Sequence, residues 1–296
     1  SSHLNPQIWD TSTPTLATNH APLIIPLKPN HPYPAQCQYP IPQQALKGLK
    51  PVITHLLQHG LLKPTNSPYN SPILPIQKLD KSYRLVQDLH LINQIVLPIH
   101  PIVPNLYTLL SSIPPSTTHY FVIDLKDTFF TIPLYPSSQP LFAFTWTDPD
   151  THQSQQLTWT VLPQGFRDSP HYFGQALSHD LLSFRPSAST LFNILMIFFF
   201  AALLPIFPAG HYPASSTSLL KGVLSIPSKA QISSPSITYL GIMLHQHTHT
   251  LPADSVQLIS QTPTPTTKQQ LPSFLGIVGY FQLWIPGFAI LIKPLY

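Results

Sequence analysis

The sequence predicts an α+β fold, and three observations lead to that prediction. Apolar residues recur every three or four positions in one early segment, which is typical of an amphipathic helix. Runs of β-branched and aromatic residues of strand length dominate the middle of the chain. There is no internal repeat and no Gly-rich phosphate loop of the kind that opens a parallel, doubly wound sheet. At 296 residues with 43% hydrophobic residues, the chain can bury a core.

Composition excludes several classes of protein. Only 8% of the residues are charged, against about 25% in ordinary soluble domains. All ten acidic residues are Asp, and 37 residues are Pro. This balance excludes a coiled coil, a charged repeat and an acidic disordered chain. The single cysteine, Cys37, excludes an internal disulfide and is expected to be a small buried hydrophobe. A net charge of +4 permits a polyanionic partner without requiring one.

The N-terminal segment is expected to be extended. Residues 22, 26, 29, 32, 34, 40 and 42 are all Pro, which blocks helix and favours extended or polyproline II backbone. We therefore expect residues 1–42 to form a strap laid over a domain. The first ten residues lack the basic and apolar regions of a signal peptide, so an intracellular protein is expected.

A helix and a hairpin are predicted next. The amphipathic pattern from Gln43 to Leu62 predicts a helix that bends near Pro51 and ends at Gly60. Two short apolar runs, Ile73 to Ile76 and Tyr83 to Asp88, flank a polar turn and predict a β-hairpin.

The middle of the chain predicts a buried strand with a carboxylate at its tip. Residues 119–134 contain a β-branched and aromatic run that reaches Asp124 before a turn or short helix, for which Asp127 is the expected N-cap. The following elements are a strand pair at Phe142–Trp146 and Gln156–Val161, a helix at His171–Phe184, a strand–turn–strand at Ile232–Leu244 and, over Gln269–Ala289, a helix followed by the segment WIPGFA.

Two segments leave alternatives open. No charged residue occurs from Pro186 to Leu220, and residues 191–207 are nearly all apolar, which fits either a short membrane span or an apolar insert in a soluble fold. We expect the insert, because neither a positive-inside pattern nor an aromatic belt accompanies the run. His245, His247 and His249 would share one face of a strand and could bind zinc, although a solvated hairpin is expected instead.

Seven motifs in a fixed order carry a resemblance to a known family. They are APLIIPLKP at 21–29, SYRLVQDLHLIN at 82–93, FVIDLKDTFF at 121–130, QPLFAFTW at 139–146, LTWTVLPQGFRDSP at 157–170, TYLGIML at 238–244 and LWIPGFA at 283–289. Together they resemble the reverse transcriptase of gammaretrovirus-like endogenous retroviral Pol, from about residue 21 to residue 296. The resemblance implies an RNA-directed DNA polymerase with the right-hand fold of fingers, palm and thumb.

The resemblance also implies domains, cofactors and partners. It places the strap at 1–42, the fingers at 43–118, the palm at 119–245 and the connection toward the thumb at 246–296, with an aberrant uncharged stretch at 186–226. Two Mg²⁺ ions are expected in the family, with no organic cofactor. The implied partners are an RNA or DNA template-primer and a dNTP.

Specific residues match the family's motifs. Asp124 falls on the first catalytic, metal-binding carboxylate, Phe129 on the aromatic gate against the ribose 2′-hydroxyl, and Gln164 on the residue that positions the nucleotide and template. The other matches are Lys78 and Arg84 for the triphosphate, the backbone of Leu125 and Lys229 near the nucleotide, and Tyr239, Leu240 and Gly241 for the primer grip.

The family's second and third carboxylates are missing. They come from a hairpin with the pattern Gln-Tyr-X-Asp-Asp-Leu-Leu, whose place is occupied here by residues 193–199, NILMIFF. Met196 is encoded by ATG and the Ile197 codon begins with AT, so a frame one base earlier encodes Asp at that point. We therefore infer a one-base slip near Leu191 or Phe192 and a compensating slip between residues 220 and 228.

Loss of this pair predicts a reverse transcriptase domain without polymerase activity, because one Asp cannot hold two Mg²⁺ ions. Two alternatives remain: a nucleic-acid-binding remnant without chemistry and, more weakly, a membrane-inserted fragment through residues 191–207.

Overall fold

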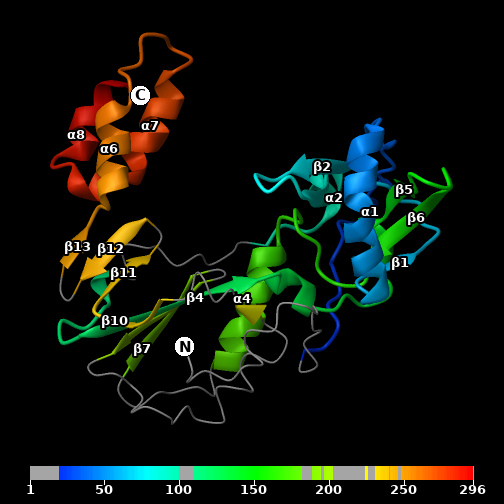
Figure 1. Ribbon diagram of the computed structural model, residues 1–296, viewed down its shortest axis with the longest axis horizontal. Helices are drawn as coiled ribbons and strands as arrows, with labels where there is room; N and C mark the ends of the chain where they lie inside the picture. The colour runs from blue at the N-terminus through cyan, green and yellow to red at the C-terminus, as the bar shows by residue number, and fades with distance from the viewer. Residues whose placement is uncertain are drawn as a thin grey trace. The chain divides into compact units, whose positions relative to one another are not determined.

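The computed structural model describes residues 20–99, 110–181, 189–194, 197–202, 224–225, 231–239, 241–245 and 248–295. The chain divides into two compact units, one up to Ser233 and one from Ser234 (Figure 1). The helices and strands of the first unit are α1 (Gln43–Gln58), β1 (Leu62–Pro64), β2 (Ile73–Gln77), β3 (Tyr83–Gln87), α2 (His90–Ile95), β4 (His119–Lys126), β5 (Phe144–Thr147), β6 (Ser154–Trp159), α4 (Ser169–Leu181), β7 (Ser189–Ile194), β8 (Ile197–Ala202) and β9 (Leu224–Ser225), followed by β10 (Gln231–Ser234) at the boundary.

Helix α1 confirms the amphipathic prediction. Its buried residues are Ala45, Leu49, Ile53 and Leu56, spaced three or four apart, so one stripe of the helix faces the core. The helix ends two residues before Gly60, whose φ of +68° is a left-handed conformation that suits glycine.

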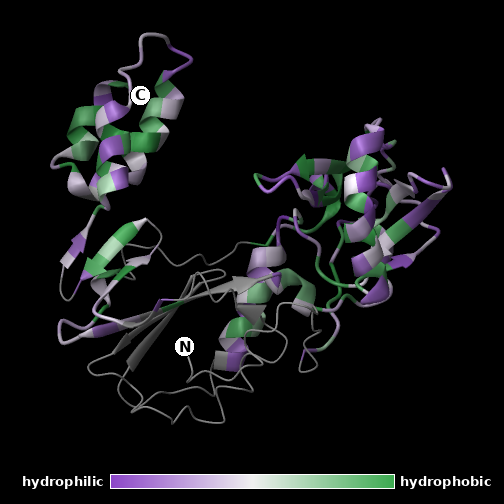
Figure 2. Cartoon of the chain, in the orientation of Figure 1, coloured by the Kyte–Doolittle hydropathy of each residue, from purple (hydrophilic) through white to green (hydrophobic). Residues whose placement is uncertain are grey.

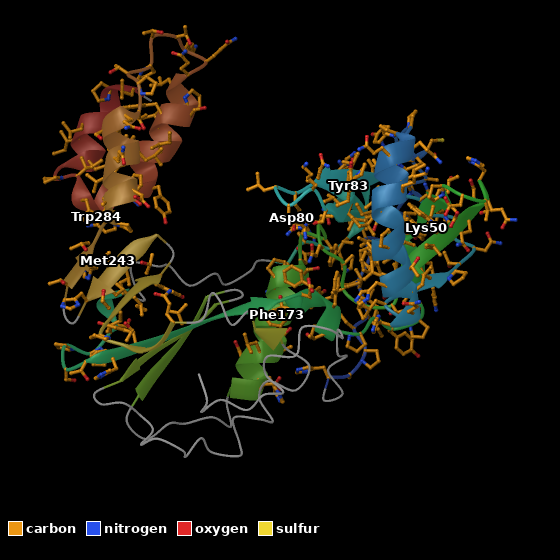
Figure 3. All side chains as sticks on the ribbon, in the orientation of Figure 1. Lys50, Asp80, Tyr83, Phe173, Met243 and Trp284 are labelled. Atoms are coloured by element: carbon orange, nitrogen blue, oxygen red, sulfur yellow. The ribbon has the colours of Figure 1, made fainter. Side chains whose placement is uncertain are left out.

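Helix α1 lies between the β2–β3 hairpin and the sheet that contains β1, and it contacts both (Figure 1). The predicted hairpin is confirmed, with Ile73 paired with Gln87 and Gln77 with Tyr83 in antiparallel register. Gly48 of α1 faces the ring of Tyr83 in β3, and a Cβ atom at Gly48 would lie 2.2 Å from the Tyr83 Cδ2 atom. The lack of a side chain at Gly48 therefore sets how closely α1 approaches the hairpin; Figure 3 labels Tyr83.

The sheets join strands from both sides of Asp124 in the sequence. Strands β5 and β6 follow Asp124 in sequence, yet they pair with β1 in a three-stranded sheet of order β1-β6-β5. The range 119–245, expected to be one palm, therefore contributes strands to the sheet beside α1. Its other strands form a second sheet of order β10-β4-β8-β7, with β9 also paired to β4. The antiparallel registers of β1–β6, β5–β6, β4–β8 and β7–β8 agree with the α+β prediction.

Residues 20–42 run along the surface of the first unit as extended chain. Single bridges join Leu23 to Leu134, Leu27 to Val96 and Ala35 to Asn70. In this segment only Ile25 is buried. Cys37 is exposed, so the expectation of a buried cysteine is wrong, because this extended segment turns few of its side chains into the core.

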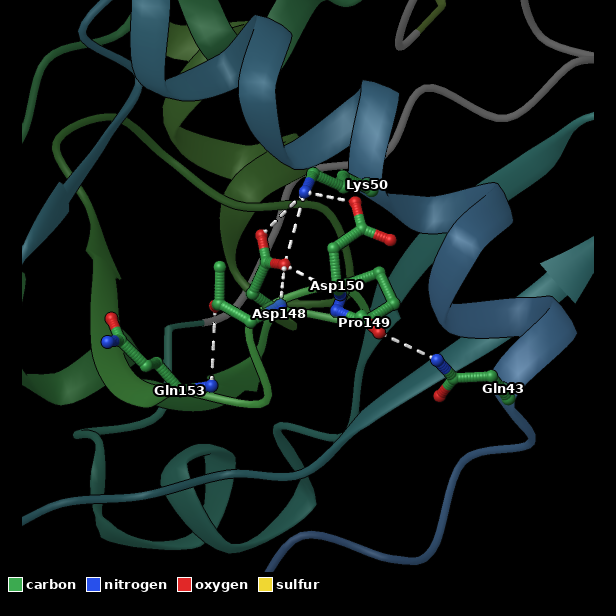
Figure 4. A network of polar contacts seen from close by, with 7 residues as sticks. Gln43, Lys50, Asp148, Pro149, Asp150 and Gln153 are labelled. Carbon is green, nitrogen blue, oxygen red and sulfur yellow. Dashed lines mark hydrogen bonds and ion pairs between the residues drawn. The ribbon is translucent and has the colours of Figure 1, made fainter.

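An ion-pair cluster ties α1 to the β5–β6 turn (Figure 4). The Lys50 ammonium lies 2.9 Å from an Asp148 carboxylate oxygen and 2.6 Å from one of Asp150. Gln43 donates to the Pro149 carbonyl over 2.7 Å, at the start of the same helix. The Lys50 hydrogen bond, helped by the backbone N–H groups of Asp150 and Thr151, lowers the pKa of Asp148 to about 2.

The second unit contains one small sheet and three helices. Strands β11 (Ser236–Tyr239), β12 (Ile242–His245) and β13 (Thr248–Thr250) pair in that order, so the expected boundary at 245/246 divides a hairpin. The helices are α6 (Ala253–Gln261), α7 (Leu271–Tyr280) and α8 (Phe288–Ile292), with a 3₁₀ turn at Gln282–Trp284.

Two predictions about this unit can be compared with the structure. The predicted helix near Gln269 is confirmed as α7, which ends at Tyr280; after it come a 3₁₀ turn and, beyond Gly287 with its φ of +69°, a separate short helix. Helix α7 is nearly all apolar (Figure 2). The solvated hairpin expected around the histidines is also confirmed, because β12 pairs with β13 and both His245 and His249 are exposed. The register pairs His245 with Thr248 and His249 with Leu244, which puts the two histidines on different strands and opposite faces. His247 lies outside the described residues.

The apolar run at 191–207 falls largely on β7 and β8 where it is described. Within the ranges given above, no helix is both long and apolar enough to cross a membrane.

Candidate functional site

Strand β4 carries the predicted catalytic aspartate, but not at its end. Asp124 pairs with Ile197 of β8, and the strand continues through Leu125 and Lys126, which pair with β9. The expectation of a strand ending at Asp124 is therefore wrong by two residues, because β9 adds ladder hydrogen bonds that the local sequence does not reveal. The side chains of Asp124 and Leu125 lie outside the described set.

A 3₁₀ turn, Thr128–Thr131, follows β4 and carries Phe129. The Phe129 ring is half-buried and packs edge-on against Phe173 of α4, with ring centroids 6.2 Å apart; Figure 3 labels Phe173. Asp127 occupies the N-cap position with a φ of +51°, but its side chain makes no capping hydrogen bond. The expected capping role is wrong in that respect, since the left-handed backbone at Asp127 lacks the β-region geometry of side-chain caps.

A close backbone contact and a side-chain hydrogen bond hold the loop that carries Gln164. At Gly165 φ is +91°, and a Cβ atom there would lie 3.2 Å from the Gln87 carbonyl oxygen, so glycine allows the loop to approach the end of β3. After the loop, the Ser169 hydroxyl donates to the Pro163 carbonyl over 3.0 Å. Gln164 itself is half-buried.

Arg167 connects the same loop to Asn93 and Asp168 through hydrogen bonds. The Arg167 backbone N–H donates to the Asn93 side-chain oxygen, and its guanidinium donates to the Asn93 carbonyl. The guanidinium also forms two bonds, of 2.8 and 3.0 Å, with the buried carboxylate of Asp168, which raises the pKa of Arg167. The sequence motifs did not single out Asn93, Arg167 and Asp168, although polar residues beside LPQGF were a signal that this loop needs side-chain partners.

A buried glutamine connects this loop to the sheet beside α1. The Gln87 side chain donates to the carbonyls of Phe142 and Ala143 and accepts from the Trp159 indole N–H over 3.0 Å. Gln87 ends β3, so the hairpin and the Gln164 loop meet at one residue. The tertiary structure therefore brings the predicted fingers hairpin to the base of the loop.

The predicted triphosphate cations lie on this hairpin. Lys78 follows β2 and Arg84 is paired with Ile76, and both side chains are exposed. At the turn, the Asp80 carboxylate accepts from the backbone N–H and hydroxyl of Ser82, which lowers the pKa of Asp80 (Figure 3 labels Asp80). The hairpin thus presents these two cations, together with Lys81 at its turn, to solvent.

Of the remaining predicted residues, two lie outside the described residues and two lie in the second unit. Lys229 and Leu240 lie outside the described residues. Tyr239 ends β11 in the second unit, where it is 1% exposed and burial raises its pKa. Gly241 has a φ of +73°, and a Cβ there would lie 2.9 Å from the Tyr280 hydroxyl oxygen.

The strands that pair with β4 supply no carboxylate to complete a two-metal site. The chain has no Asp or Glu between Asp180 and Asp254, an interval that includes β7, β8, β9 and β10. The neighbours of β4 in the sheet therefore supply no carboxylate. Across the described part of the chain, no three His, Cys, Asp or Glu side chains gather in a group able to hold a metal ion.

Comparison with known proteins identifies the family. Residues 76–201 match the family "Reverse transcriptase (RNA-dependent DNA polymerase)". The chain is 43% identical to the Gag-Pol polyprotein of avian reticuloendotheliosis virus, over 98% of its own length and 26% of that protein. It is 41% identical to the Pol polyprotein of feline endogenous virus ECE1, over 98% of its length and 28% of that protein. The chain thus spans less than a third of these relatives.

Similar solved structures agree with this family match. A foamy viral protease-reverse transcriptase in complex with double-stranded DNA gives a TM-score of 0.77 at 26% identity, over 94% of this chain and 47% of that one. The same kind of protein in complex with an RNA/DNA hybrid gives a TM-score of 0.77 at 25% identity, over 98% of this chain and 38% of that one. The chain is therefore a homologue of retroviral Pol polyproteins along nearly its whole length, and its residues 76–201 belong to the reverse transcriptase family.

Proposed function

We propose that this chain is the fingers and palm region of an endogenous retroviral reverse transcriptase that has lost the ability to copy nucleic acid. One observation carries the proposal: the β7–β8 hairpin pairs beside Asp124, and neither strand contains a carboxylate. The two strands pair in antiparallel register, with Ile194 opposite Ile197, and β8 is entirely apolar.

The chemistry of strand extension explains why the loss is decisive. Two Mg²⁺ ions about 4 Å apart have to be held by several carboxylates, so that one ion activates the primer 3′-oxygen and the other stabilises the leaving pyrophosphate. A single aspartate supplies too few oxygen ligands for both ions. The missing charge stabilisation in the transition state is worth several kcal/mol, roughly a thousandfold or more in rate.

The reading-frame hypothesis explains how a hairpin can survive without its motif. A one-base shift replaces the residues of a segment while keeping its length. The new residues here are strongly apolar and aromatic, and such residues favour strands. The β7–β8 hairpin is therefore compatible with a shifted frame, and Asp124, encoded before the shift, is retained.

Primer extension tests this proposal. The chain is expected to show no template-dependent DNA synthesis with Mg²⁺ or Mn²⁺. Its matched control is a protein translated from the same gene with the frame moved by one base between the codon of residue 191 and those of residues 220–228, so that Gln-Tyr-X-Asp-Asp-Leu-Leu is encoded. We expect the repaired protein to gain synthesis. Synthesis by the unrepaired chain would refute inactivity, and an inactive but folded repaired protein would refute the missing pair as its cause.

A second candidate function, binding of a nucleic acid without chemistry, is favoured by the charge pattern of the fingers. Between His20 and Leu79 the charged residues are five lysines, with no Asp or Glu. The similar foamy viral structures hold double-stranded DNA or an RNA/DNA hybrid. With only 14 cations in the chain, binding is expected to be weak and strongly salt-dependent.

Fluorescence anisotropy of a labelled primer-template duplex at several salt concentrations tests binding. Replacing the two predicted triphosphate cations of the hairpin, Lys78→Gln with Arg84→Gln, is expected to lower the salt slope by about 2 if both contact phosphates. Lys50→Gln is the matched control, because Asp148 and Asp150 already neutralise Lys50. The absence of any binding at low salt would exclude this function.

A further inference from the structure

We propose that His55 and His59 form a two-imidazole binding site for a divalent transition metal ion that prefers nitrogen ligands, such as Zn²⁺, Ni²⁺ or Cu²⁺. The two residues lie four apart at the C-terminal end of α1, so their side chains share one face of the helix. Their ring centroids are 4.2 Å apart with an interplanar angle of 46°. His55 is exposed and His59 is half-buried, so an ion can reach both rings from solvent.

A backbone contact leaves one nitrogen of His59 available for a metal. Its Nδ1 atom lies 2.8 Å from the His55 carbonyl oxygen. A carbonyl oxygen only accepts hydrogen bonds, so Nδ1 carries the proton in this contact. In the neutral ring the lone pair is then on Nε2, the atom that can bind a metal. A hydrogen bond from the other ring nitrogen to a carbonyl is the usual support of a metal-binding histidine.

The spacing of the rings requires only a small adjustment. Imidazole nitrogens bind zinc at about 2.0–2.1 Å, so two of them on one tetrahedral ion lie about 3.3 Å apart. Rings whose centroids are 4.2 Å apart reach this arrangement by opening by roughly 1 Å or less, through side-chain rotation. In the part of the chain that the structure describes, no third His, Cys, Asp or Glu completes the group, so water fills the remaining positions.

Binding at this place is expected to stabilise the fold. The end of α1 is held by bonds from the Gly60 N–H to the Leu57 carbonyl, from the Leu61 N–H to the Leu56 carbonyl and from the Thr160 hydroxyl to the Gly60 carbonyl. The folded chain therefore holds the two imidazoles on one helical turn, which the unfolded chain does not. An ion that binds the folded state better than the unfolded state raises its stability with increasing concentration.

Thermal unfolding of the tag-free chain with NiCl₂ tests the site. At pH 8, Tm is expected to rise with the logarithm of the Ni²⁺ concentration above the Kd and to return with EDTA. His55→Gln and His59→Gln are each expected to remove most of this rise. His179→Gln is the matched control, because this exposed histidine of α4 has no second imidazole one turn away.

A direct measurement separates binding from folding defects. Equilibrium dialysis of Ni²⁺ at pH 8 is expected to show one fewer bound ion in either variant than in the parent chain and in His179→Gln. The metal-free Tm values of the variants show whether they fold. A Tm rise that survives both single substitutions, or no rise in the parent chain at millimolar Ni²⁺, would overturn the proposal.

Discussion

Substitution of Gly48 by alanine tests how α1 packs on the β2–β3 hairpin. An added Cβ atom would lie 2.2, 2.5 and 3.1 Å from the Cδ2, Cε2 and Cγ atoms of Tyr83, which is closer than real carbon atoms approach. The ring therefore has to move, or α1 has to shift away from β3. Overpacking of this kind costs about 1–3 kcal/mol of unfolding free energy.

Helix propensity acts in the opposite direction. Replacing glycine by alanine in a helix interior stabilises the helix by about 1 kcal/mol. The net expectation for Gly48→Ala is therefore a loss of up to about 2 kcal/mol. Gly174→Ala on α4 is the matched control, because no atom lies within 4 Å of its added Cβ. This variant is expected to gain about 0.5–1 kcal/mol, as the propensity acts without a clash.

Urea unfolding followed by tryptophan fluorescence measures both variants. A double-mutant cycle with Tyr83→Ala attributes the effect: removing the ring is expected to convert Gly48→Ala from a loss into a gain, with a coupling free energy of at least about 1 kcal/mol. If Gly48→Ala stabilises the chain as much as Gly174→Ala does, the close approach of α1 to Tyr83 is refuted.

Three further predictions concern the polar contacts. Gln87→Leu is expected to lower the unfolding free energy by about 3 kcal/mol, because it leaves the Trp159 N–H and the Phe142 carbonyl without their buried partner. Gln77→Leu, at an exposed position of the same hairpin, should change the unfolding free energy by less than about 0.5 kcal/mol. Equal losses in the two variants would contradict the hydrogen-bond network around Gln87. Asp148, whose pKa is lowered to about 2, is expected to stabilise the fold above its unfolded pKa of 3.8, and this contribution is lost as the pH falls from 3.8 through about 2. Acid titrations of the unfolding free energy of the parent chain and of Lys50→Met should therefore converge in this pH window and at high salt. Parallel curves would count against the ion pair. Gly165→Ala is expected to lower the unfolding free energy by about 1–2 kcal/mol, because φ at this position is +91° and the added Cβ would lie 3.2 Å from a carbonyl oxygen. Urea unfolding measures this loss, and an unchanged midpoint would contradict the strain at Gly165.

Predictions from local pattern succeeded where burial follows a short repeat. The stripe from Ala45 to Leu56 predicted α1, and two apolar runs around a polar turn predicted the β2–β3 hairpin. Predictions from local pattern failed where the decisive contact joins residues that are distant in sequence. The end of β4 depends on β9, about a hundred residues later, and the exposure of Cys37 depends on how residues 20–42 lie on the first unit.

The residues of the candidate site likewise fall into a group that the sequence alone could indicate and a group that only the structure reveals. The motif residues Asp124, Phe129 and Gln164 could be selected from sequence, because their motifs are contiguous. The residues that hold the Gln164 loop, Asn93 and Gln87, could not, since they come from segments about 70 residues earlier.

By itself the sequence determined the class of the fold, the relation to reverse transcriptases and the lack of a carboxylate between Asp180 and Asp254, because composition and contiguous motifs need no knowledge of which segments meet. Only the tertiary structure decided that an apolar hairpin lies beside Asp124, that strands β5 and β6 join β1, and that two imidazoles stand 4.2 Å apart on α1. The physical reason is that strand pairing and side-chain contact join residues whose separation along the chain carries no local signal.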